Sequence, residues 1–183
     1  FLSADRADIP RCVAEAGCNA VVLEMKSEDG SLAYVSALPL AIKEKHSLAD
    51  PGRNSALRRL NLTPNLYTVA CVFFDENEEY LNDICVELAS LGFDEILMRG
   101  FPTTEPESLS LALAPYPIAL SFMLPPTRHL SRSKWDFDFI RYADHIWTNS
   151  DLSTYDGLKF PKEDMIVMGK DQNTEFLNWA ILD

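Results

Sequence analysis

Short apolar runs that end in polar residues recur along this chain, and the clearest of them is NAVVLEMKSEDG, residues 19–30. In a strand over residues 19–26, the alternation of residues 20–26 would place Glu24 and Lys26 on one face and Val21, Leu23 and Met25 on the other, because side chains alternate along a strand. Burying a carboxylate and an ammonium costs several kcal/mol unless they pair or meet a polar cleft. The two charges therefore indicate either a functional site or a structural ion pair where the strand ends.

Further apolar runs predict more strands. They cover residues 1–4, 66–74, 93–101, 118–124, 145–149 and 165–168, with a short apolar piece at 32–35 after a polar turn at 27–30. Helical periodicity predicts helices over residues 5–16, 55–60, 78–91, 107–113, 137–142 and 174–182. The helix over 78–91 has the most regular apolar stripe, and Gly92 ends it. Residues 36–54 contain two prolines and a glycine, so most of this segment is expected to be irregular.

Helices that alternate with short, almost wholly apolar strands are typical of a parallel sheet covered by helices. Such a sheet either closes into a (β/α)8 barrel or stays open and doubly wound. The open folds usually carry a glycine-rich phosphate turn, whereas this chain has seven glycines and neither a GxGxxG nor a GxxxxGK motif. We therefore predict the α/β class, with residues 1–183 forming a single compact or truncated (β/α)8 TIM-like barrel domain. The barrel would be trimmed, since about 250 residues are typical.

Composition narrows the range of partners. The chain has 16 Lys and Arg residues against 28 Asp and Glu, a formal charge of −12, which disfavours nucleic acid and anionic lipid. No apolar run approaches the roughly 18 residues of a transmembrane helix, so direct membrane insertion by this domain is not expected. The chain begins at Phe1 without a methionine. This start suggests a piece excised from a longer protein and leaves a cytoplasmic or a cell-envelope origin open.

The cysteines and histidines show no metal-ligand spacing. The four cysteines lack a CxxC pair, and the three histidines lack HxH and HExxH motifs. The cysteines are therefore expected to be small core residues or isolated thiols, and Cys71 to be buried and inert. Surface or capping roles are expected for the histidines, His46, His129 and His145. We expect neither a metal nor another cofactor.

Polar residues gather at the carboxyl ends of the predicted strands, where TIM barrels carry their sites. These residues are Glu24, Lys26, Asp75, Arg99, Asn149, Asp151 and Lys170. Asp75 or Asp151 could face the same mouth as Glu24 and form an acid–base pair with it. Asp75 also begins an acidic stretch, residues 75–79, that suits the solvated start of a helix, and both interpretations stay open.

Other conspicuous residues have a structural interpretation. Asp94 and Glu95 precede an apolar run and are expected at the opposite, amino-terminal end of the strands, where residues serve stability. Trp147 lies in a predicted strand and Trp179 in a predicted helix, so both are expected in the core. Trp135 lies in a polar loop and is the better candidate for stacking against a sugar ring.

Two phrases in the chain resemble a bacterial family assigned as glycoside hydrolases, α-amylase-like TIM barrels of poorly known function. NAVVLEMKSEDG resembles that family's NAVVIDVKDDSG-type segment. A second phrase, ELASLGFDEILMRGFP at residues 87–102, resembles its EAAKLGFDEIQFDYVRFP-type segment. The resemblance implies a TIM barrel that acts on or binds carbohydrate at its carboxyl-terminal mouth.

The chain departs from this family at the expected catalytic positions. Glu24 stands where the family has an aspartate, Lys26 is kept, and the aspartate of FDYVRFP has no counterpart before Arg99. Glycoside hydrolysis generally needs two carboxyl groups that flank the bond. Two hypotheses therefore stay open: a glycoside hydrolase-like enzyme, and a catalytically degenerate barrel that binds a glycan or a protein partner.

The enzyme hypothesis assigns a role to each candidate residue. Glu24, Lys26 and Asp75 are the catalytic residues, with Glu24 as acid or base. Contacts with the carbohydrate are assigned to Arg99, Asn149, Asp151, Trp135 and Lys170. A third hypothesis uses Lys26 as a Schiff-base lysine, as aldolase-type barrels do, and it is disfavoured because a lysine beside a glutamate tends to stay protonated.

Overall fold

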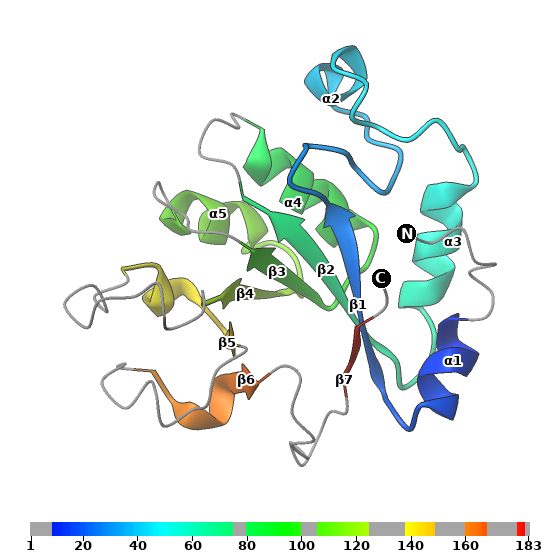
Figure 1. Ribbon diagram of the computed structural model, residues 1–183. Helices are drawn as coiled ribbons and strands as arrows, with labels where there is room; N and C mark the ends of the chain where they lie inside the picture. Colours follow the sequence, from blue (N-terminus) through cyan, green and yellow to red (C-terminus); the bar gives the residue numbers. More distant parts are fainter. Residues whose placement is uncertain are drawn as a thin grey trace.

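Seven parallel strands form one sheet in the computed structural model of the chain (Figure 1), counted over the residues that the structure describes: 9–74, 80–99, 106–124, 138–148, 160–167 and 179–181. The strands are β1 (Ala20–Lys26), β2 (Tyr67–Phe73), β3 (Glu95–Arg99), β4 (Ala119–Met123), β5 (His145–Thr148), β6 (Met165–Val167) and β7 (Trp179–Ile181). The helices are α1 (Ile9–Glu15), α2 (Pro39–Lys43), α3 (Arg53–Asn61), α4 (Leu81–Ser90) and α5 (Pro106–Leu113), with 3₁₀ helices η4 (Asp138–Tyr142) and η6 (Lys162–Asp164).

The order of the strands in the sheet is β6-β5-β4-β3-β2-β1-β7. Consecutive strands from β1 to β6 lie side by side, and the last strand, β7, pairs with the first. A doubly wound sheet instead reverses its order at a switch point. Sequential winding that returns to β1 is the topology of a (β/α)8 barrel, with fewer strands than the usual eight. The prediction of a truncated TIM-like barrel is therefore confirmed.

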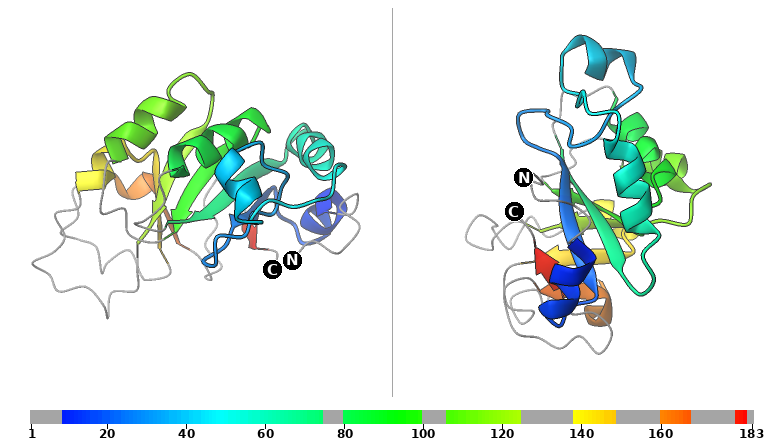
Figure 2. Two further views of the ribbon diagram at one scale, coloured as in Figure 1. Left: turned by 90° about the horizontal axis from the view of Figure 1, so that it is seen from above. Right: turned by 90° about the vertical axis from the view of Figure 1, so that its right-hand side faces the viewer.

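The two faces of the sheet pack against different partners. Figure 2 shows α3, α4 and α5 on the same face. The larger apolar cluster lies on this face and includes Val21, Leu23 and Met25 of β1 together with Leu88 of α4. The opposite face, which is the inner face of a barrel, carries a smaller cluster: Val22, Val69, Cys71, Leu97, Trp147 and Ile166. The alternation predicted for residues 19–26 is therefore present, with its apolar face toward the helices.

An aspartate before a strand caps the neighbouring strand at two places in the sheet. Asp94, which precedes β3, accepts hydrogen bonds through Oδ2 from the Thr68 backbone N–H (2.7 Å) and the Thr68 hydroxyl (3.1 Å). Asp144, which precedes β5, accepts one from the Leu120 N–H (2.8 Å). Buried backbone donors need a partner. Side chains therefore complete the hydrogen bonding at the amino-terminal edge of the sheet.

One predicted element needs correction. Residues 36–54 are irregular over most of their length, as expected, apart from the short helix α2 and the first residues of α3. The final helix predicted over residues 174–182 is wrong, because Trp179–Ile181 forms β7 and pairs in parallel with residues 20–22 of β1. A short apolar run suits either a helix or a strand, and the pairing edge of β1 decides between them. The strand predicted over residues 1–4 lies outside the described residues.

The turn after β1 packs closely against the segment that follows α2. Gly30 has a φ of +85°, and a Cβ added there would lie 2.7 Å from His46 Cε1, whereas Gly17 has a φ of +71° with nothing within 4 Å. We expect Gly17→Ala to lower the free energy of unfolding by about 1–2 kcal/mol, the cost of a left-handed backbone. Gly30→Ala should cost more, because the new methyl group also displaces His46. Urea unfolding measures both losses.

A His46→Ala background provides the control for this prediction. Removing the imidazole should make the two glycine substitutions equally costly. An excess cost of Gly30→Ala that survives in this background would show that the contact with His46 is not its cause.

Candidate functional site

Glu24 and Arg99 meet at the carboxyl ends of β1 and β3. Arg99 Nη1 lies 3.7 Å from Glu24 Oε2, and the two side chains are 53% and 30% exposed. β2 lies between these strands, and the register places Cys71 opposite Glu24 and Phe73 opposite Arg99. The two charged side chains therefore reach across β2 and form a partly exposed ion pair at the mouth of the barrel. Of the residues predicted for the site, these two are brought into contact.

Lys26 has a different environment from Glu24. Its side chain is fully buried, and Nζ donates a hydrogen bond to the carbonyl of Phe73 (2.9 Å). The register of β1 against β2 shifts between Glu24 and Lys26. Beyond this shift, the Lys26 side chain joins the end of β1 to the end of β2 through its hydrogen bond to Phe73. A buried ammonium that bonds to the backbone is poorly placed to attack a carbonyl substrate. The burial of Lys26 therefore disfavours the Schiff-base hypothesis and favours a structural role.

Cys71 lies beside the ion pair in the inner cluster of the sheet. Its thiol is almost completely buried. Burial raises the pKa of Cys71 to about 11, with Arg99 lowering it and Glu24 raising it by smaller amounts. The thiolate is the nucleophilic form of cysteine, so this thiol reacts only slowly at neutral pH. The expectation of a buried, inert Cys71 agrees with this geometry.

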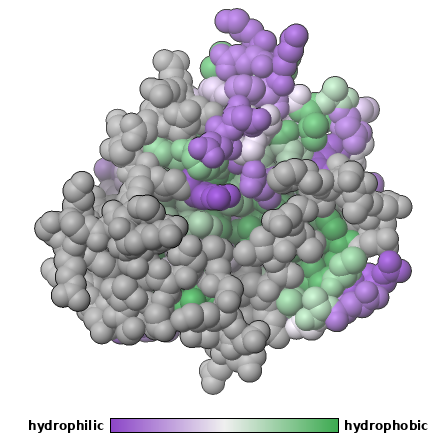
Figure 3. Space-filling view, viewed as in Figure 1, coloured by the Kyte–Doolittle hydropathy of each residue, from purple (hydrophilic) through white to green (hydrophobic). Residues whose placement is uncertain are grey.

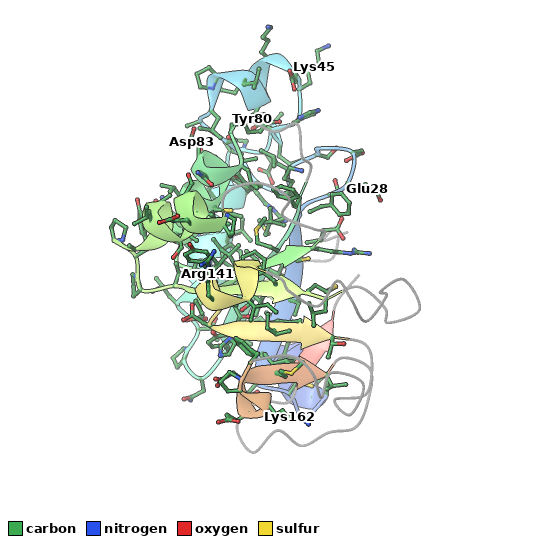
Figure 4. The ribbon with its side chains drawn as sticks, turned by 90° about the vertical axis from the view of Figure 1, so that its left-hand side faces the viewer. Glu28, Lys45, Tyr80, Asp83, Arg141 and Lys162 are labelled. Atoms are coloured by element: carbon green, nitrogen blue, oxygen red, sulfur yellow. The ribbon has the colours of Figure 1, made fainter. Side chains whose placement is uncertain are left out.

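A tight polar turn continues β1 beyond the mouth. Asp29 Oδ1 accepts hydrogen bonds from the Ser27 hydroxyl (2.6 Å) and the Ser31 backbone N–H (3.0 Å). These bonds, the Ser27 one first, lower the pKa of Asp29 to about 2. Figure 4 shows Glu28, from the same turn, projecting away from the helices. Figure 3 shows hydrophilic side chains gathered at the top of the molecule around α2, beyond this turn.

Several predicted site residues cannot be placed at the mouth. Asp75, Trp135, Asn149, Asp151 and Lys170 lie outside the described residues. Their assignment to the site therefore stays a prediction. Across the described ranges, no group of three or more His, Cys, Asp and Glu residues is arranged to hold a metal ion. None of the helices in the same ranges combines the length and the hydrophobicity that crossing a membrane requires.

A second polar cluster lies at the amino-terminal end of the strands, around the fully buried carboxylate of Glu95. Tyr67 donates its hydroxyl proton to Oε2 (3.0 Å), and His145 Nδ1 lies 3.0 Å from the same oxygen. Trp147 Nε1–H donates to Oε1 (2.7 Å), and so does the Ser121 hydroxyl. Donors from β2, β4 and β5 thus converge on one carboxylate of β3. We call Glu95 and these four partners the floor cluster.

The floor cluster changes the ionisation of its members. The hydrogen bond to Glu95 raises the pKa of His145, and desolvation opposes this effect only in part. Burial, followed by the charge of Glu95, raises the pKa of Tyr67 well above its usual range. His145 therefore serves as a partner of a buried carboxylate and not as the surface or capping histidine that was predicted. The pairs Asp94–Glu95 and Asp144–His145 each stand just before an apolar run, and this repeated pattern is the sequence signal that could have linked them.

Comparison with known proteins supports the fold and nothing finer. No protein-family model and no curated protein matches the chain. A solved structure of the tryptophan synthase A-subunit from Pyrococcus furiosus, a TIM barrel, is similar with a TM-score of 0.50 and 13% identity, covering 89% of this chain and 84% of that one. A hypothetical protein from Ruminiclostridium thermocellum is similar with a TM-score of 0.45 and 17% identity, covering 64% of this chain and 89% of that one.

These comparisons correct the resemblance to glycoside hydrolases. The barrel that matches most of this chain is a tryptophan synthase subunit, and no glycoside hydrolase family is supported. At 13% identity the match shows a shared fold only. The two phrases at residues 19–30 and 87–102 contain β1 and β3, and runs of this composition are common to parallel barrel strands. The assignment to the glycoside hydrolase family is therefore wrong.

The contacts of the floor cluster predict that replacing its central carboxylate, Glu95, lowers the stability of the protein strongly. Glu95→Gln keeps the shape of the side chain but cannot accept from all four donors, so buried donors lose their partner. We expect the free energy of unfolding to fall by about 3–5 kcal/mol. Urea denaturation measures the loss. Glu107→Gln, on the exposed first turn of α5, is the matched control and should change stability by less than about 0.5 kcal/mol. Equal effects of the two substitutions would contradict the role of Glu95.

The raised pKa of His145 predicts that the stability of the protein depends on pH. Its pKa is higher in the folded protein than in the unfolded chain, so its contribution is complete below about pH 6.5 and is lost as the pH rises through the folded value. Urea unfolding midpoints between pH 5 and 9 should therefore decline less steeply for His145→Gln than for the wild type. Glu107→Gln, on the exposed first turn of α5 and outside the floor cluster, should keep the wild-type slope. If His145→Gln also keeps that slope, the linkage is absent.

Proposed function

We propose that this domain binds a neutral carbohydrate at the mouth of the barrel through Glu24 and Arg99, and that it does not cleave it. The observation that carries the proposal is the partly exposed Glu24–Arg99 pair at the carboxyl ends of β1 and β3, the end where TIM-barrel proteins bind their ligands. A carboxylate accepts hydrogen bonds and a guanidinium donates them. Side by side, the two match adjacent sugar hydroxyls, each of which can both donate and accept.

The charges at the mouth favour a neutral ligand over an anionic one. Glu24 offsets the charge of Arg99, and Lys26 is buried and bonded to the backbone of β2. The chain as a whole carries a formal charge of −12, which repels anions. Of the described cations at the mouth, Arg99 is paired with Glu24 and Lys26 is buried, so neither offsets this repulsion for a phosphorylated or carboxylated ligand. A neutral, polyhydroxylated molecule is not repelled by the negative charge of the chain.

The carboxylates of the described strands support binding without cleavage. Glycoside hydrolysis generally uses two carboxyl groups placed on either side of the bond. Within the described strands, Glu24 is the sole carboxylate in the carboxyl-terminal half of any strand. Trp135, Asn149 and Lys170 are proposed as further contacts with the sugar on the strength of the sequence pattern, and the assay for released reducing sugar below tests whether Asp75 or Asp151 supplies a second carboxylate.

The test measures the binding of a panel of neutral sugars: glucose, galactose, mannose, maltose and cellobiose. Isothermal titration with wild-type protein should detect at least one of them. Glu24→Gln and Arg99→Gln should each weaken that interaction about tenfold, because each removes a charge-assisted hydrogen bond. Glu107→Gln should bind as the wild type does.

Two results would overturn this proposal. One is the absence of binding to every sugar of the panel at millimolar concentration. The other is the release of reducing sugar from maltose or cellobiose, if Glu24→Gln abolishes that release, because the domain would then be an enzyme.

A further inference from the structure

A carboxylate on α4 holds the chain that follows β1. Glu87 Oε2 accepts hydrogen bonds from the Tyr34 hydroxyl (2.9 Å) and the Ser36 hydroxyl (2.7 Å). Glu87 Oε1 accepts one from the Ala37 backbone N–H (2.8 Å). Tyr34 and Ser36 are both buried, so these bonds are shielded from water. One side chain therefore fixes residues 34–37 against α4.

α3 holds the same segment from a second side. Asn54 accepts from the Val35 N–H (2.9 Å) and donates to the Val35 carbonyl (2.7 Å). The buried Arg53 donates through Nε to the carbonyl of Ala33. The segment is thus held between two helices, and Figure 1 shows it passing near α4 before it reaches α2.

The held segment is joined directly to the end of β1. Lys26 and Leu32 form an antiparallel bridge, and the Ala33 N–H donates to the Met25 carbonyl (2.9 Å). Met25 is also where the register of β1 shifts against β2, immediately after Glu24. A bulge of this kind redirects the backbone next to it. The position of Glu24 therefore depends on the hairpin of residues 25–33, and the hairpin depends on residues 34–37.

We infer that Glu87 is a positioning residue for the sugar site: it holds Tyr34, Ser36 and Ala37, and through the hairpin it keeps Glu24 in place beside Arg99. This inference rests on the proposed function for its ligand. That Glu87 holds residues 34–37, and through them Glu24, is inferred from the hydrogen bonds and does not depend on the ligand. Supporting residues around a site commonly change its affinity by tenfold or more without touching the ligand.

The experiment compares Glu87→Gln with Asp83→Asn. Both residues lie on α4 four positions apart, both substitutions remove one negative charge, and Asp83 is exposed (Figure 4). The amide side chain introduced by Glu87→Gln would retain one oxygen, so the Ala37 N–H or the two hydroxyl groups must lose their acceptor. If Glu87→Gln does not fold, Tyr34→Phe takes its place, because it removes one of the three bonds and leaves the carboxylate.

The first readout needs no ligand. Alkylation by iodoacetamide, resolved by peptide mass spectrometry, reports Cys71 beside Glu24 and the partly buried Cys18, which stands before the amino-terminal end of β1. We expect Glu87→Gln to accelerate labelling of Cys71 about tenfold, the effect of one lost hydrogen bond. Labelling of Cys18 should not change, and Asp83→Asn should label as the wild type does. Unchanged labelling of Cys71, or equal acceleration at both thiols, would overturn the positioning role.

The second readout is the affinity for the sugar of the panel that the wild type binds most tightly. We expect Glu87→Gln to weaken it about tenfold and Asp83→Asn to leave it unchanged. Faster labelling of Cys71 with unchanged affinity would overturn the link between Glu87 and the ligand. If the wild type binds no sugar, the proposed function fails, and the labelling comparison alone decides whether Glu87 positions Glu24.

Discussion

The buried carboxylate of Glu95 is the constraint on which the inner face of the sheet depends. It is the one fully buried acidic side chain among the described residues, and four donors from three neighbouring strands point at it. Leaving a buried carboxylate without partners would cost several kcal/mol. The strands β2 to β5 must therefore keep a register in which Tyr67, Ser121, His145 and Trp147 all reach it. Asp94 and Asp144 support the same edge through backbone hydrogen bonds.

The two ends of the barrel are consequently built for different tasks. At the amino-terminal end, the buried carboxylate of Glu95 is bonded to buried and half-buried side chains. At the carboxyl-terminal end, Glu24 and Arg99 are partly exposed, and their ion pair is longer than the contacts in the floor cluster. An exposed ion pair contributes little to stability. Its place at the mouth agrees with the binding site that we propose, and the hairpin and Glu87 are proposed to supply the rigidity that such a site needs.

The similarity to a tryptophan synthase subunit shows that a shared fold does not imply a shared site. Two chains with 13% identity share a barrel because parallel strands impose the same apolar composition and the same right-handed helical connections. That requirement also explains why phrases such as those at residues 19–30 and 87–102 resemble segments of an unrelated barrel family. Site chemistry depends on single side chains at the strand ends, and these are not constrained by the fold.

The α/β class, the barrel, most of the helices and strands, and the place of Glu24 near the carboxyl end of β1 could be predicted from the sequence, because they follow from local periodicity and from a charge inside an apolar run. The contact between Glu24 and Arg99 became visible in the folded chain alone. Arg99 lies far away in sequence and two strands away in the sheet, and the partners of Glu95 and Glu87 also come from other elements of the chain. The same holds for Trp179–Ile181, whose apolar run suits a helix locally and becomes a strand beside β1. Contacts of this kind depend on strand order and register, which no local pattern contains.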